Sequence, residues 1–383
     1  MAEIGGVALS ERGEYKSTVK LPDEIDEITP QFLTAALSKK HPGITVKDFN
    51  IVDIHHGFTT IVRMDLELDE AAKQAGIPSR MTLKGGFEPS TRGRARDFAV
   101  GAFLMEVPSY RVAQPAFGLN MPTCYFAEID LEQKQMIILM EDLCLRNVRF
   151  CHGLVPHTVE QVRRRLTTLA EYHAKSWGHP ELEPGGRFDI FPGNGCNMFH
   201  KYMHHVGYAD PREYKKYTDA PRGAATSPSF HDVNWILDAL AYGAELSDAV
   251  PNIVCHGDTH SGNLFEEADG TPGFLDSLPR CEAAMIEISY FITNVMDPAD
   301  RRRHDRELVA HYRNELARCG VDVPDLDELL RQFAVFLPYG YVTFIVNENT
   351  YQTESFNTAH ASRYGIAMLD HNTREVLKQA KIP

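Results

Sequence analysis

Residues 253–265 form a strand and a loop whose residue types and spacing suit phosphoryl transfer. Three residues of this segment, His256, Asp258 and Asn263, follow the pattern His-x-Asp-x-x-x-x-Asn. An aspartate in such a loop can accept the proton of an attacking hydroxyl group, and the asparagine can offer its oxygen to a magnesium ion. We therefore predict that Asp258 is a catalytic base and that Asn263 is a metal ligand.

A second acid follows a short distance along the chain, at the end of another apolar run. Residues 273–275 are Gly, Phe and Leu, and Asp276 comes directly after them. Carboxylate and amide oxygens are the hard ligands that Mg²⁺ prefers, so Asp276 and Asn263 are expected at one magnesium ion. The alternative is a polar turn between two strands, with Asp276 an ordinary surface acid.

Transfer from ATP also needs a cation to neutralise the phosphates. Lys84 lies in the apolar segment 81–85, where a buried ammonium group is costly without a partner. Glu106, on a predicted helix, can supply that partner, and the ion pair would aim Lys84 at the α- and β-phosphates. A lone strand lysine that faces solvent at a sheet edge is the alternative.

A turn and a linker complete the predicted nucleotide contacts. Gly57 can make a tight turn between two strands, so that the amides and hydroxyl groups of Thr59 and Thr60 touch phosphate. An ordinary hairpin is the alternative for this turn. Adenine is expected to bind backbone groups of Glu141 and Leu143, between the two halves of the chain.

The pattern of apolar residues predicts an α+β protein with two lobes and a shared cleft. Residues 1–140 are expected to form the N-terminal lobe, an antiparallel sheet with helices that covers the nucleotide. The predicted strands are 46–54, 60–68, 80–85, 123–129 and 135–139, and the predicted helices lie within 22–42 and 94–112.

Residues 141–383 are expected to form a larger, mainly helical lobe with the catalytic loop and the acceptor site. Helical periodicity marks 159–177, 232–246 and 301–318. Residues 180–228 are weakly periodic, and we assign them no structure. The aromatic stretch 333–344 is expected to be mostly core, with a residue or two lining a pocket for the acceptor.

Composition narrows the class of partner. The 383 residues are 43% hydrophobic and 24% charged, which is typical of a folded protein, and no apolar run is long enough to cross a bilayer. The N-terminus lacks a secretory signal pattern, so we expect a cytoplasmic protein. A net charge of -14 disfavours nucleic acid and anionic membranes as partners. Nothing in the sequence indicates the oligomeric state or a preference between ATP and GTP.

Several segments resemble the aminoglycoside phosphotransferase and choline kinase superfamily, in particular its ecdysteroid kinase-like branch. The segments are 21–22, 139–143, 169–174, 256–263 and 287–291. The resemblance implies a protein-kinase-like bilobal fold, the cofactors ATP and Mg²⁺, and a small-molecule hydroxyl group as acceptor. By that resemblance Asp258 is the catalytic aspartate, Asn263 and Asp276 bind magnesium, and Lys84 and Glu106 orient the phosphates.

Two positions depart from the family pattern. The family usually has Trp and a polar residue after the second metal aspartate, whereas Ser277 and Leu278 follow Asp276 here. The family's helix aspartate is replaced by Glu287. Neither change removes an oxygen that the reaction needs, but both bear on the shape of the site and on the range of substrates.

The predicted function is therefore an ATP- and Mg²⁺-dependent small-molecule kinase, whose acceptor we expect to be hydroxylated and moderately apolar. A protein kinase is disfavoured because the chain lacks Asp-Phe-Gly and Ala-Pro-Glu triplets. Two alternatives stay open. One is a non-catalytic nucleotide-binding module, and the other is a dinuclear metal phosphoesterase that uses the Asp and His residues near 53–55 and 258–260.

Overall fold

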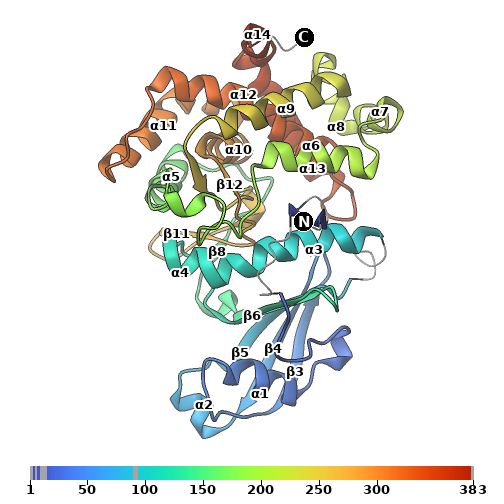
Figure 1. Ribbon diagram of the computed structural model, residues 1–383, viewed down its shortest axis with the longest axis vertical. Helices are drawn as coiled ribbons and strands as arrows, with labels where there is room; N and C mark the ends of the chain where they lie inside the picture. The colour runs from blue at the N-terminus through green and yellow to red at the C-terminus, as the bar shows by residue number, and fades with distance from the viewer. Residues whose placement is uncertain (1–2, 5–6, 9–14, 89–93, 381–383) are drawn as a thin grey trace. The chain divides into compact units, whose positions relative to one another are not determined.

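The computed structural model describes residues 3–4, 7–8, 15–88 and 94–380, and the chain divides into two compact units (Figure 1). Unit 1 comprises Met1–Ala116 and Asn120–Val148, and unit 2 comprises Phe117–Leu119 and Arg149–Pro383. All seven cysteines are free thiols. Across the described ranges, no helix combines the length and the apolar character needed to span a membrane.

Unit 1 contains the antiparallel sheet that the sequence predicts. Its elements are β1 (Glu3–Ile4), β2 (Val7–Ala8), η1 (Ile25–Glu27), α1 (Pro30–Ser38), β3 (Val46–His55), β4 (Thr60–Leu68), α2 (Glu70–Gln74), β5 (Arg80–Gly85), α3 (Arg94–Pro108), the π-helix η3 (Ser109–Ala113), α4 (Gln114–Phe117, whose last residue belongs to unit 2), β6 (Cys124–Asp130), β7 (Gln135–Glu141) and η4 (Leu143–Leu145). Five strands pair in the order β3-β4-β5-β7-β6, and every neighbouring pair is antiparallel.

Helix α1 lies within the predicted range 22–42, and its start is set by a local cap. The Thr29 side chain accepts a hydrogen bond from the backbone NH of Phe32 at 3.1 Å, and Pro30 occupies the first turn. Phe32 and Leu33 are buried in a core that also takes in one face of the sheet. Leu83 of β5 belongs to that core.

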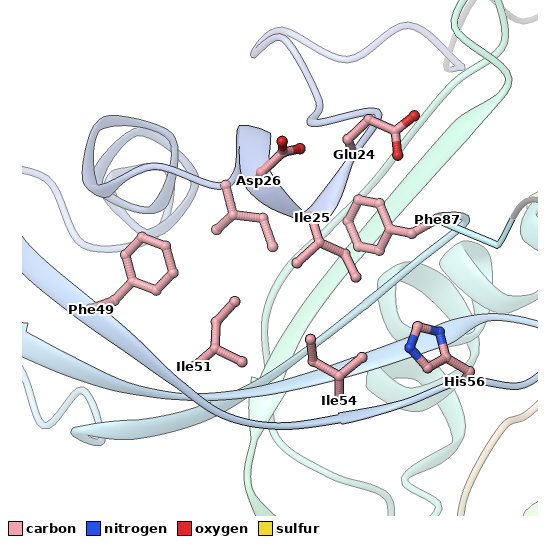
Figure 2. A pocket seen from close by; sticks show the side chains of 9 residues that line it. Glu24, Ile25, Asp26, Phe49, Ile51, Ile54, His56 and Phe87 are labelled. Atoms are coloured by element: carbon pink, nitrogen blue, oxygen red, sulfur yellow. The ribbon is translucent and has the colours of Figure 1, made fainter.

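The two faces of the sheet differ chemically. Side chains alternate along a strand, so Lys84 points to the face opposite Leu83. Cross-strand pairing places Ile54 opposite Val62, and Val62 opposite Leu83, so Ile54 shares the Leu83 face. A hollow of about 510 Å³ lies on that face, lined by Glu24, Ile25, Asp26, Ile28, Phe49, Ile51, Ile54, His56 and Phe87 (Figure 2). The hollow is therefore on the side of the sheet away from Lys84.

Unit 2 is mainly helical, as predicted. Its elements are β8 (Arg149–Phe150), α5 (Val159–Ala174), η5 (Pro180–Leu182), α6 (Gly195–Val206), α7 (Pro211–Thr218), α8 (Pro221–Ala224), η6 (Pro228–Phe230), α9 (Val233–Asp248), β9 (Asn252–Val254), η7 (Ser261–Asn263), β10 (Leu264–Glu266), β11 (Pro272–Phe274), β12 (Cys281–Ala283), α10 (Ala284–Val295), α11 (Pro298–Arg318), α12 (Leu326–Ile345), α13 (Glu354–Asp370) and α14 (Thr373–Gln379).

The centre of unit 2 is helix α10, in which every residue is buried. It packs against α5, α11, α12 and α13, which surround it within the unit (Figure 1). The aromatic stretch 333–344 lies in α12 and is buried apart from the half-exposed Thr343, so the prediction that it is mostly core is confirmed. Residues 180–228, to which we assigned no structure, contain three short α-helices and two 3-10 turns.

Candidate active site

Helix α10 holds the loop 256–263 through three side chains on one helical stripe. Glu287 accepts hydrogen bonds from the backbone NH groups of His256 at 3.0 Å and Gly257 at 2.8 Å. The Tyr290 hydroxyl donates to the Asp258 carboxylate at 3.1 Å. Asn294 accepts from the backbone NH of Ser261 at 2.9 Å. Residues three and four apart share a helical face, so a single helix fixes most of the loop.

Gly257 turns the chain tightly just before the predicted base. Its φ of +91° lies in the left-handed region, and a Cβ added there would come within 1.9 Å of the Leu278 carbonyl oxygen. The backbone NH of Leu278 in turn donates to the His256 carbonyl at 2.8 Å, which holds the two segments together. Only glycine therefore fits at this point of the loop.

Asp258 and Asn263 are brought together as the sequence predicts. The Asn263 side-chain amide donates to the Asp258 carboxylate and to the Asp258 backbone oxygen, each at 3.0 Å. Asp258 is partly exposed, whereas Asn263 is 8% exposed. Since Tyr290 binds Oδ1 and Asn263 binds Oδ2, both carboxylate oxygens of the predicted base have a donor.

Asp276 comes just after strand β11. Strand β11 pairs with β10, and β10 begins directly after Asn263. Leu264 of β10 lies opposite Phe274 of β11, and the backbone NH of Leu275 donates to the Asn263 carbonyl at 2.8 Å. Asn263 and Asp276 therefore come from the same end of one hairpin. Asp276 has a φ of +51°, a left-handed conformation that aspartate tolerates better than most residues.

A buried arginine that the sequence analysis did not identify supports the loop. The Arg280 guanidinium donates to the Gly257 carbonyl at 2.9 Å and to the Tyr339 hydroxyl at 3.2 Å, and it pairs with Glu282 at 3.1 Å. Burial alone would lower the pKa of Arg280, but the Glu282 carboxylate outweighs that effect and the net direction is upward. The cation is therefore retained below the loop.

A hydrogen-bonded histidine orients Glu287. His173 of α5 bonds Glu287 through Nε2 at 2.8 Å and the Tyr312 hydroxyl through Nδ1 at 2.7 Å, and neither His173 nor Tyr312 is exposed. Burial acts to raise the pKa of Glu287, but the hydrogen bond from His173 and the backbone donors outweigh it, so the pKa lies below its usual value. Glu287 is thus a buried carboxylate.

In unit 1, the predicted pair of Lys84 and Glu106 is confirmed. The Lys84 ammonium contacts the Glu106 carboxylate at 2.7 Å, and the two residues are 4% and 3% exposed. Glu106 lies near the C-terminal end of α3 and Lys84 near the end of β5. The lysine therefore has a fixed partner, on the sheet face opposite the hollow.

The turn between β3 and β4 is formed, but Thr60 has another partner. Its hydroxyl donates to the Glu88 carboxylate at 2.6 Å, and the residue is fully buried, whereas Thr59 is 9% exposed. Gly57 does not have a positive φ, and a Cβ there would meet only the Thr59 carbonyl, at 3.4 Å, so nothing at this position requires glycine. Phosphate contact by Gly57, Thr59 and Thr60 stays a prediction.

The end of β7 carries the predicted adenine contacts. The backbone NH of Glu141 donates to the Thr123 carbonyl at 3.0 Å, and the Leu143 carbonyl accepts from the NH of Arg146 at 2.9 Å. These two groups are engaged within unit 1. The adenine prediction therefore depends on the remaining backbone groups of Glu141 and Leu143, and it stays a prediction.

Comparison with known proteins finds a family for the segment that contains Asp258, Asn263 and Asp276. The model of the ecdysteroid kinase-like family matches residues 111–323, which is more than half of the chain. No curated protein sequence matches the chain.

The chain is also similar to solved structures. One is an aminoglycoside phosphotransferase from Alicyclobacillus acidocaldarius, with 13% identity, a TM-score of 0.46, and 95% of this chain and 98% of that chain covered. Another is an ethanolamine kinase from Plasmodium vivax, with 10% identity, a TM-score of 0.44, and 83% and 82% covered. A third is a choline kinase from Streptococcus pneumoniae, with 10% identity, a TM-score of 0.42, and 88% and 98% covered.

Proposed function

Because the chain belongs to the ecdysteroid kinase-like family, we propose that it transfers the γ-phosphoryl group of ATP to a hydroxyl group of a small molecule, with Asp258 as the base. The observation that carries the proposal is the geometry of one loop. Asp258 and Asn263 lie within hydrogen-bond distance, at 3.0 Å, on a loop that α10 fixes at three points. The proposed base Asp258 and the proposed metal ligand Asn263 are thereby held next to each other before any substrate binds.

The side-chain oxygens of Asn263 and Asp276 are suitable ligands for a magnesium ion. The Asn263 nitrogen is turned to Asp258, so its amide oxygen is the atom left for a metal. Asp276 adds a carboxylate from the same end of the hairpin. Magnesium prefers such hard oxygens, and when bound it neutralises charge on the β- and γ-phosphates. Asn263 and Asp276 are therefore proposed as its ligands.

Asp258 would act on the acceptor. Its carboxylate accepts the proton of the attacking hydroxyl group while the new oxygen–phosphorus bond forms and the bond to the β-phosphate oxygen breaks, which releases ADP. Lys84, held by Glu106, is proposed to neutralise the α- and β-phosphates. Gly57, Thr59, Thr60, Glu141 and Leu143 are proposed to contact the remainder of the nucleotide.

The acceptor is proposed to bind unit 2. Tyr339 lies in the aromatic stretch 333–344 and contacts Tyr290, with ring centroids 5.7 Å apart, and Tyr290 bonds the base. Phe199 of α6 extends this aromatic cluster, with its ring 6.0 Å from that of Tyr339. These contacts support a hydroxylated, moderately apolar acceptor.

The phosphoesterase alternative receives no support. Among the residues that the structure describes, no group of three or more His, Cys, Asp and Glu side chains is arranged to hold a metal ion. Asp53, one of the residues on which that alternative depended, lies on β3 near the Arg63 guanidinium, at 3.8 Å. A dinuclear centre needs several such ligands around two metals.

The proposal is tested by incubating the purified protein with ATP, Mg²⁺ and a library of small alcohols, and detecting ADP together with a phosphorylated product by mass spectrometry. The Asp258→Asn variant should keep its affinity for ATP and lose about 100-fold or more of its turnover. ATP binding without any product would instead indicate a nucleotide-binding module. Release of phosphate from phosphorylated compounds without ATP would indicate a phosphoesterase.

A further inference from the structure

Tyr290 is the buried neighbour of the proposed base. It is 4% exposed, and its hydroxyl donates to Oδ1 of Asp258 at 3.1 Å, while Asn263 donates to Oδ2 at 3.0 Å. A carboxylate has about four lone-pair positions, so these two donors leave two for an incoming hydroxyl group. Tyr290 therefore touches the base without filling its capacity as an acceptor.

The ring of Tyr290 is fixed by other aromatic side chains. It stacks on Phe344, with centroids 6.0 Å apart and planes inclined by 17°, and it contacts the rings of Tyr339 at 5.7 Å and Tyr364 at 5.9 Å. The Tyr364 hydroxyl donates to the Tyr290 carbonyl at 2.7 Å. Neither the ring nor its backbone can therefore move far, and the hydroxyl stays in one place.

The hydroxyl of Tyr290 also remains a donor. Burial, and then the negative charge of Asp258, raise the pKa of Tyr290 well above its ordinary value. A phenol that stays protonated offers one hydrogen to the carboxylate, and a hydrogen bond to a charged group is stronger than one between neutral groups.

We propose that Tyr290 is a positioning residue for phosphoryl transfer: its hydroxyl holds the Asp258 carboxylate in the one rotamer that meets the acceptor's hydroxyl group. This inference rests on the proposed function. Asn263, and the more distant His260 with its Nε2 3.7 Å away, both meet the carboxylate at Oδ2, so they leave rotation about the side-chain bonds. Reacting groups must be aligned within a fraction of an ångström, so a second fixed donor has a direct effect on rate.

The first test is the Tyr290→Phe variant, which removes one oxygen and keeps the ring. Turnover should fall about tenfold or more while the KM for ATP stays within about twofold, because the lost contact is to a charged base and not to the nucleotide. Tyr214→Phe is the matched control. Tyr214 of α7 is 1% exposed and lies outside both the loop 256–263 and the aromatic stretch 333–344, so this variant loses a buried hydroxyl elsewhere in unit 2 and should keep its turnover.

A double-mutant cycle separates positioning from a general structural effect. If Tyr290 acts through the carboxylate, Tyr290→Phe should cause no further loss of the residual rate in an Asp258→Asn background. An equal loss in both backgrounds would overturn the proposal, as would wild-type turnover in the single variant.

Failure of the proposed function would be recognised separately, since the wild-type protein would then phosphorylate no alcohol. In that case the crystal structure of Tyr290→Phe decides the matter. A changed or multiple rotamer of Asp258 supports positioning by the tyrosine hydroxyl, and an Asp258 side chain in its original place refutes it.

Discussion

His173 and Glu287 form a buried hydrogen-bonded pair beneath the loop that carries the proposed base. The atoms Nε2 and Oε2 are 2.8 Å apart, and the two residues are 0% and 2% exposed. The same carboxylate accepts the backbone NH groups of His256 and Gly257. One negative charge therefore ties α5, α10 and the loop together.

We expect Glu287→Gln to lower the free energy of unfolding by about 3 kcal/mol, because the amide keeps the size but loses the charge and one acceptor oxygen. Urea denaturation measures this, with the exposed Glu183→Gln as a control that should change it by less than about 0.5 kcal/mol. The folded pKa of Glu287 is below its ordinary 4.5. Its contribution is thus complete above that value and is lost as pH falls through the folded pKa. An equal cost in both variants would contradict this account.

We expect Gly257→Ala to destabilise the protein far more than Gly43→Ala. Both glycines have positive φ, +91° and +87°, so both substitutions carry the backbone cost of about 1 kcal/mol. Only at Gly257 would the new Cβ collide with a backbone oxygen, whereas no atom lies within 4 Å of the position at Gly43. The difference between the melting temperatures of the two variants therefore measures the cost of the collision. Equal melting temperatures would show that the loop can move aside.

Breaking the Lys84–Glu106 pair should affect stability and nucleotide use differently. Lys84→Met leaves the Glu106 carboxylate buried without its 2.7 Å partner and should cost about 3 kcal/mol or more. Combining it with Glu106→Leu should restore most of that stability, since two apolar side chains replace two charges. The KM for ATP should be higher than that of the wild-type protein in both the single and the double variant. Recovery of ATP use in the double variant would exclude Lys84 as a phosphate ligand.

The stability of the protein should fall as pH is lowered from 7.5 to 5. His157 is 5% exposed, and among the described residues neither of its ring nitrogens has a hydrogen-bond partner. Burial, reinforced by the Arg165 charge, lowers the pKa of His157 to about 4. In the unfolded chain His157 binds a proton below its ordinary pKa of 6.5, whereas in the folded chain it is still neutral at pH 5. This residue alone should therefore lower the free energy of unfolding by about 2 kcal/mol at pH 5. His157→Leu should lose this part of the pH dependence in urea titrations, and an unchanged slope would argue against it.

The strands and the ion pair of unit 1 were predictable because their signals are local. Alternation along 60–68 and 80–85 defines strands, and a buried lysine demands an acid nearby. The family relationship expected from the motifs is confirmed by the match over 111–323. Helix α6 was missed because Gly195 and Asn197 near its start obscure its period, although Asn194 caps it at 2.9 Å.

The supporting residues of the loop were harder to predict. Glu287, Tyr290 and Asn294 are polar residues spaced three and four apart in an otherwise apolar helix, which was a usable signal for a buried polar stripe. Arg280 gave no such signal, because only its ion-pair partner Glu282 is close in sequence, whereas the Gly257 carbonyl and the Tyr339 hydroxyl, which link it to the site, are distant. Such a residue is recognised only after the chain has folded.

Because the loop is attached to a single stripe of α10, the position of the loop depends on the orientation of that helix. An α-helix turns by about 100° per residue, so a slip of one residue would carry Glu287, Tyr290 and Asn294 away from the loop together. Any partner or mutation that rotates α10, however distant, would switch the chemistry off as a unit instead of weakening it in steps.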